Sequence, residues 1–175
     1  MKKIWLVLAS LIFVTSVNAE TPYTGMQTRS IKALSEQQVA DLGAGRGMGL
    51  AMVAELNGYP GPSHVLELAD RLELAADQRA KVQHLFDSMK AEAIPLGSRL
   101  IAQEADLDGQ FARHTVTPES LKASTAAIAE TQGALRETHL KYHLLTGEIL
   151  TPPQMLTYAE LRGYGAGHQH QQHHH

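Results

Sequence analysis

The stretch RETHLKYHLLTGEILTPPQ, residues 136–154, joins the end of one expected helix to the start of the next. Thr151 can cap the second helix, with Pro152 in its first turn and Gln154 placed to complete a capping box. Upstream, His139 and His143 are four residues apart, so in a helix they lie on one face within reach of a shared ligand. The stretch therefore predicts a corner between two helices beside a pair of histidines.

Two long apolar stripes upstream of this corner predict a pair of helices. One stripe recurs at three- and four-residue steps over residues 82–111, and the other over residues 121–149, with His139 on the stripe itself. The connection between them, residues 114–116, is short, so the two helices should pack as an antiparallel hairpin. Gln103 and Gln132 are expected to be polar interruptions of an otherwise apolar seam.

The segments before the hairpin predict shorter helices separated by a glycine-rich break. Ser35 begins a capping box, and the helical pattern that follows is interrupted by glycines at positions 43, 45, 47 and 49. Residues 57–62, NGYPGP, predict a turn. Ser63 is expected to cap a helix over residues 64–72, with His64 in its first turn.

Both ends of the chain differ in composition from the helical part. Residues 1–19 have two lysines, an apolar run and a small-residue cleavage site, the layout of a secretory signal peptide that is cleaved before Glu20. An uncleaved membrane anchor is the alternative. Residues 20–33 predict an extended, mobile lead-in, residues 34–162 a helical domain, and residues 163–175 a flexible tail rich in glycine and histidine. The tail is interpreted as native, a purification tag being the alternative.

Composition excludes several classes of function. Without residues 1–19 the chain has 13 basic and 18 acidic side chains, a net charge of −5 with neutral histidines. This charge, with no basic patch, argues against binding to nucleic acid or to an anionic membrane. The chain has no cysteine, so thiolate metal sites and cysteine catalysis are excluded. No paired-carboxylate, nucleophile-elbow or HExxH motif is present, so an enzyme is not expected and no catalytic residue is assigned.

Histidines are the candidate ligands for a divalent transition metal, Zn, Cu, Ni or Co. His139 and His143 would form the centre of the site. A further ligand would come from His64 or Glu67, of this chain or of a second one, and Glu137 and Glu148 are other nearby carboxylates. The tail adds His168, His170, His173, His174 and His175. Because imidazole binds metal when neutral, affinity should fall as the pH drops through about 6.5. The alternative is that His139 is a hydrogen-bonded core residue and that His64 and His143 lie on the surface.

The repeated Leu-Ser/Thr-x-x-Gln pattern, at residues 34–38, weakly at 74–78 and fully at 150–154, supports a resemblance. With the signal peptide and the helical hairpin, it resembles the periplasmic LTxxQ-motif superfamily over residues 34–162. That superfamily contains Spy/CpxP-type chaperones and the zinc-resistance-associated and heavy-metal resistance and sensor proteins. The resemblance implies an all-α fold of four to five helices, a hooked hairpin that is usually dimeric, with a role in envelope stress or metal homeostasis.

Two functions follow from this resemblance as expectations. The chaperones of the superfamily resemble basic cradles, whereas this chain is acidic, so the preferred function is a periplasmic metal-binding protein of the heavy-metal resistance or sensor type. The alternative is an ATP-independent Spy/CpxP-like chaperone. The expected partners are a metal ion and a second copy of the chain, and further candidates are an unfolded client or a membrane-bound stress or resistance protein.

Overall fold

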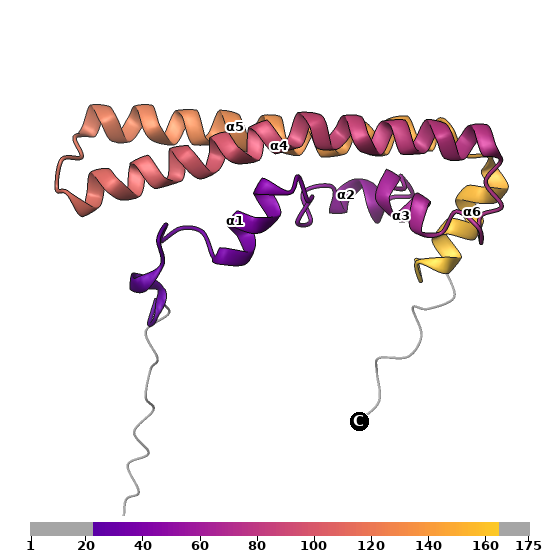
Figure 1. Ribbon diagram of the computed structural model, residues 1–175, viewed down its shortest axis with the longest axis horizontal. Helices are drawn as coiled ribbons and strands as arrows, with labels where there is room; N and C mark the ends of the chain where they lie inside the picture. Colours follow the sequence, from indigo (N-terminus) through magenta and orange to yellow (C-terminus); the bar gives the residue numbers. More distant parts are fainter. Residues whose placement is uncertain (1–22, 165–175) are drawn as a thin grey trace, which may run out of the picture.

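A long antiparallel helix pair forms the frame of the protein. The computed structural model describes residues 23–164, and no strand occurs among them. Helix α4 (Ala76–Ala112) and helix α5 (Pro118–Gly147) lie side by side along the whole length of the molecule (Figure 1). The predicted all-α hooked hairpin is confirmed. Thr117 caps α5 in a capping box with Ser120, and Pro118 occupies the first position of the helix.

The shorter helices cover one side of this pair and close its end. Helix α1 (Glu36–Gly43) packs on α4, and α2 (Met52–Glu55) and α3 (Pro62–Glu67) follow along the pair towards its other end (Figure 1). Helix α6 (Pro152–Leu161) turns back beneath that end and forms the hook. None of the helices in residues 23–164 is long and apolar enough to cross a membrane.

Capping glutamines hold the hook together. The Gln78 side chain, at the start of α4, donates to the carbonyl oxygen of Ile149 at 2.9 Å and lies within hydrogen-bond distance of the Gln154 amide. Gln154 in turn donates to the carbonyl of Leu72 and completes the capping box with Thr151. The cap pattern at 74–78, although it lacks a capping side chain at Ala75, therefore still joins α4 to α6.

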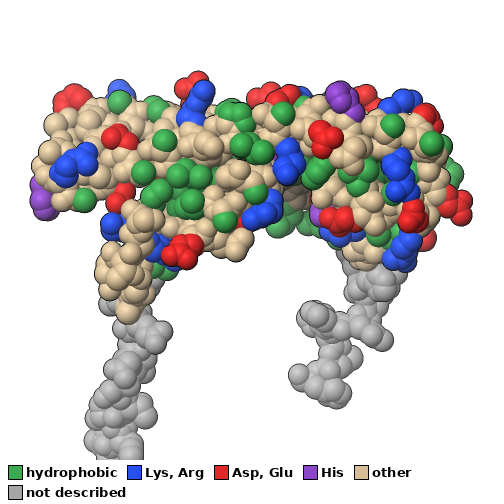
Figure 2. Space-filling view, viewed as in Figure 1, with side chains coloured by type: hydrophobic (Ala, Val, Ile, Leu, Met, Phe, Trp, Pro, Cys, Tyr) green, Lys and Arg blue, Asp and Glu red, His purple; other side chains and the backbone are tan. Residues whose placement is uncertain are grey.

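The core consists of two clusters along the helix pair. One lies under α1 and contains Leu42, Ala93, Leu100, Ile128 and Leu135; the other lies at the hook and contains Val65, Leu72, Val82, Leu150 and Tyr158. At the opposite end no third helix covers the hairpin. Phe111 is 52 % exposed and Leu121 is 38 % exposed, so the outermost parts of the predicted stripes are not core. Figure 2 shows acidic and basic side chains interspersed over the visible outer surface.

Two N-terminal segments differ from their predictions. Helix α3 begins at Pro62, with Gly61 as N-cap, and ends at Glu67, because proline fits the first helical position and Ser63 already lies inside the helix. The lead-in is more structured than expected. It contains a 3₁₀ helix, η1 (Met26–Thr28), Ile31 is buried, and Lys32 pairs with Asp108 of α4.

Gly97 sets how closely α1 approaches α4. A Cβ built on Gly97 would lie 2.2 Å from the carbonyl oxygen of Leu42, so α1 must shift in Gly97→Ala. We expect this change to lower the free energy of unfolding by about 1–3 kcal/mol, as overpacking does. The matched control is Gly133→Ala on α5, where nothing lies within 4 Å and a gain of about 0.5–1 kcal/mol is expected. Urea unfolding measures both, and equal effects would contradict the close packing of α1.

Candidate metal-binding cavity

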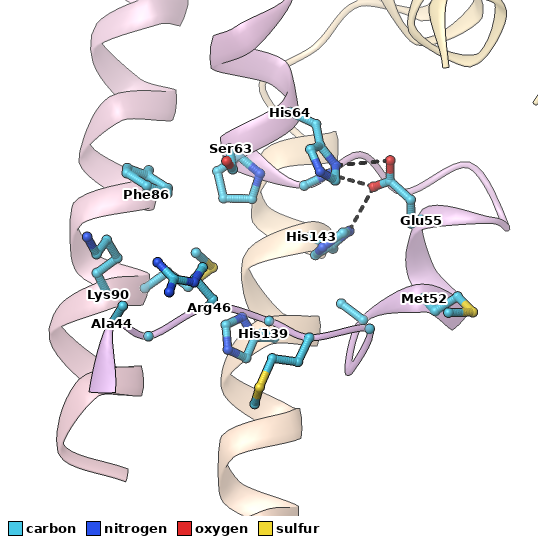
Figure 3. A pocket seen from close by; sticks show the side chains of 18 of the residues that line it. Ala44, Arg46, Met52, Glu55, Ser63, His64, Phe86, Lys90, His139 and His143 are labelled. Atoms are coloured by element: carbon cyan, nitrogen blue, oxygen red, sulfur yellow. Dashed lines mark hydrogen bonds and ion pairs between the residues drawn. The ribbon is translucent and has the colours of Figure 1, made fainter. Parts of the chain in front are cut away.

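A cavity of about 620 Å³ lies where the glycine-rich loop, α2 and α3 meet the helix pair (Figure 3). The loop, residues 44–51, forms one wall, α4 contributes Phe86, Met89 and Lys90, and α5 contributes His139 and His143. Glu55 of α2, His64 of α3 and Arg162 also line it. The structure therefore brings the three histidines predicted within the helical domain to one cavity, all from the same chain.

His139 is buried with an unused ring nitrogen. It is 3 % exposed, and its Nε2 has no hydrogen-bond partner among residues 23–164. The loop passes over the ring at Gly47, where a Cβ would lie in ordinary van der Waals contact, 3.4 Å from Nδ1. Burial lowers the pKa of His139, and the neighbouring His143 lowers it further, so the ring is neutral near pH 7 and its lone pair is available. Nε2 therefore does not fit the alternative interpretation, in which His139 is a core residue whose ring is hydrogen-bonded.

His143 is oriented by a backbone carbonyl. Its Nδ1 lies 2.7 Å from the carbonyl oxygen of Tyr59, and a carbonyl only accepts, so Nδ1 carries the proton. In the neutral ring Nε2 then holds the lone pair, the arrangement found in many metal-binding histidines. Gly61 lies against this side of the ring, where a Cβ would be 2.8 Å from Nε2. The side chain is buried, which corrects the alternative interpretation of His143 as a surface residue.

Glu55 is the buried carboxylate at the centre of the cavity wall, and the sequence analysis did not identify it. Its Oε1 accepts from the Tyr158 hydroxyl and lies 3.2 Å from His64 Nδ1 and 3.3 Å from Arg162 Nε. Its Oε2 accepts from the Gly61 amide and lies 3.7 Å from His143 Nδ1. Figure 3 shows His64 and His143 both directed at Glu55. The carboxylate thus ties α3, α5 and the end of α6 to α2.

Electrostatics keep Glu55 ionised. Burial by itself raises the pKa of this carboxyl, but the hydrogen bonds from His64 and Tyr158 outweigh burial and lower the pKa to about 2. Burial raises the pKa of Tyr158, and its hydrogen bond to Glu55 raises it further, so Tyr158 stays protonated and donates. A signal for this role existed in the sequence, because Glu55 is the one charged side chain between Arg46 and His64 in an apolar segment.

The other predicted ligands lie elsewhere. Glu67 accepts a hydrogen bond from the Ser63 hydroxyl. Glu67, Glu137 and Glu148 are not among the residues that line the cavity. The tail histidines, His168, His170, His173, His174 and His175, lie outside the described residues, as does the predicted signal peptide. Within residues 23–164 no group of three or more histidine, aspartate or glutamate side chains is already placed to hold a metal ion. A metal bound by His64, His139 and His143 would therefore require side-chain rotation.

No protein-family model matches this chain, and no curated protein or solved structure gives a significant match. The resemblance to the LTxxQ-motif superfamily stays a prediction.

Proposed function

We propose that this protein binds a transition-metal ion in the cavity between α5 and the glycine-rich loop, and acts in periplasmic metal homeostasis or envelope stress. The observation that carries the proposal is the buried Nε2 of His139, which has no partner. A buried polar atom without a partner is destabilising, and native structures seldom keep one without a reason. An ion on this nitrogen would satisfy it.

The neighbouring groups support the same role. His143 lies one turn along α5 with its Nδ1 held by the Tyr59 carbonyl, which leaves Nε2 as the ligand atom. His64 is on α3, and its Nδ1 contacts Glu55. Rotation of the His64 ring would exchange this contact to the carboxylate for one to a metal. Zn, Ni, Co and Cu all accept imidazole ligands at helical i, i+4 spacing.

The test is the double variant His139→Ala/His143→Ala in a full-length chain whose five tail histidines are replaced by serine. This background removes the metal binding that a histidine-rich tail would contribute by itself. Native mass spectrometry with Zn, Cu, Ni and Co should show one bound ion per chain before the double change. Because outer-shell residues alone contribute 10–100-fold to metal affinity, loss of both ligands should lower affinity by about 100-fold or more.

Matched controls are His84→Ala and His114→Ala, which remove exposed histidines that do not line the cavity. Circular dichroism checks that each variant keeps its helix content. Unchanged stoichiometry and affinity in the double variant would show that the histidine pair is structural.

Chaperone activity is the second candidate, and one surface favours it. Met52, Val53, Leu56 and Tyr59, on α2 and the turn after it, are between 45 % and 58 % exposed. Exposed apolar side chains so close together are a feature of surfaces that hold other proteins. Suppression of the aggregation of an unrelated unfolding protein at near-equal ratios, unchanged by a chelator, would favour this function over metal binding.

A further inference from the structure

Methionines gather at the same cavity. The chain has six methionines, and three of them, Met48, Met52 and Met89, line the cavity with His139. They come from three segments: the glycine-rich loop, α2 and α4. Met89 is buried, whereas Met48 and Met52 are 42 % and 58 % exposed.

The backbone at Met48 is in a conformation that methionine seldom adopts. Its φ is +44°, in the left-handed region, and it stands between Gly47 and Gly49, residue types that adopt this region freely. A strained non-glycine residue beside a candidate site is the kind of outlier from which function is inferred. The thioether of Met48 belongs to the same loop that passes over the His139 ring.

Charge around the cavity favours an ion of low charge. Arg46, Lys90 and Arg162 all line the cavity, whereas Glu55 is its one acidic lining residue within the described part of the chain. Glu55 is already engaged by Tyr158, His64 and Arg162, and Asp41 pairs with Arg46 from outside the lining. Because Arg46 and Arg162 are each paired with a carboxylate, the excess positive charge is that of Lys90, which repels a divalent ion twice as strongly as a monovalent one at the same position.

The donor chemistry selects the ion. Thioethers are soft, uncharged ligands that suit Cu(I), whereas hard divalent ions prefer oxygen. Resting on the proposed metal-binding function, we infer that the cavity is a site for a soft monovalent ion, Cu(I) or Ag(I), held by His139 Nε2 and the thioethers of Met48 and Met89. The side chains of Met48 and Met89 are long and unbranched, so each can change rotamer to turn its sulfur towards the ion, whereas Met52 is directed away from His139 (Figure 3).

The experiment uses Ag(I), which needs no reductant, and Zn(II) as separate probes of the full-length chain with its tail histidines replaced by serine. Affinities are measured for this protein and for the double variant Met48→Leu/Met89→Leu. Leucine conserves volume, so the fold should persist, which circular dichroism checks. We expect Ag(I) affinity to fall by about tenfold or more and Zn(II) affinity to change little. The matched control, Met26→Leu/Met155→Leu, changes methionines that do not line the cavity and should leave both affinities unchanged.

A second readout does not depend on the variants folding. With ¹³C-labelled methionine methyl groups, Ag(I) should shift the signals of Met48 and Met89 and leave those of Met26 and Met155 in place. Zn(II) binding that depends on His139 and His143, with no Ag(I)-induced methyl shifts, would overturn this inference and leave the proposed function standing. If neither Ag(I) nor Zn(II) binds, both this inference and the proposed function are overturned.

Discussion

Replacing Glu55 by alanine should lower the free energy of unfolding by about 3–5 kcal/mol, the effect of breaking a buried charge network by removing one partner. The change leaves the buried Tyr158 hydroxyl and the Gly61 amide without their acceptor, and removes the counter-charge of Arg162. Because Glu55 is where α3, α5 and α6 meet α2, the hook should loosen as a unit. Urea unfolding followed by circular dichroism measures the loss.

The pKa of Glu55 gives the size of the electrostatic part of this stabilisation. The lowering of the Glu55 pKa from 4.5 to about 2 corresponds to about 3 kcal/mol of stability. The sign follows from the depressed pKa of the folded state: the stabilisation is complete above about pH 4.5 and is lost as the pH falls towards 2. In Glu55→Ala this part of the acid sensitivity should disappear.

The control for Glu55 is Glu137→Ala, which removes an exposed carboxylate from α5. Surface changes of this kind usually alter stability by no more than about 0.5 kcal/mol. If Glu55→Ala unfolded at the same urea concentration as Glu137→Ala, the carboxylate network would not hold the hook, and the cavity wall would have to be stabilised by apolar packing alone.

Local signals predicted the frame of this fold. Ser35 and Thr151 each cap a helix as the sequence indicated, because a capping box is formed by residues three positions apart and needs no tertiary partner. The short connection between the two stripes likewise left the antiparallel arrangement as the one way to bury both. Where several local signals agree, the element and its direction follow from the sequence.

Features that depend on distant residues were harder to predict. The spacing of His139 and His143 placed them on one face, but only tertiary packing shows that one nitrogen is unused and that another is held by Tyr59. Glu55 could be singled out by its apolar neighbours, yet its partners Tyr158 and Arg162 come from more than 100 positions along the chain. A hydrogen bond across that separation leaves no periodicity to detect.

The second large effect is expected in the core under α1. Leu135 is 3 % exposed and packs in the cluster that contains Leu42, Leu100 and Ile128, so Leu135→Ala should lower the free energy of unfolding by about 2–5 kcal/mol. The loss combines the removal of apolar side-chain atoms from the core with the cavity that remains, since neighbouring helices relax only partly. Thermal and urea unfolding should both shift.

The same substitution on the other face of α5 provides its control. Leu144 is 53 % exposed on that helix, and alanine has the higher helix propensity, so Leu144→Ala should change stability by less than about 0.5 kcal/mol. Chemistry and helix are identical in the two variants, and burial is the main difference between the positions. A Leu135→Ala protein as stable as Leu144→Ala would mean that α1 and the helix pair do not share a packed core, and the loop that closes over His139 would lose the support that α1 gives it.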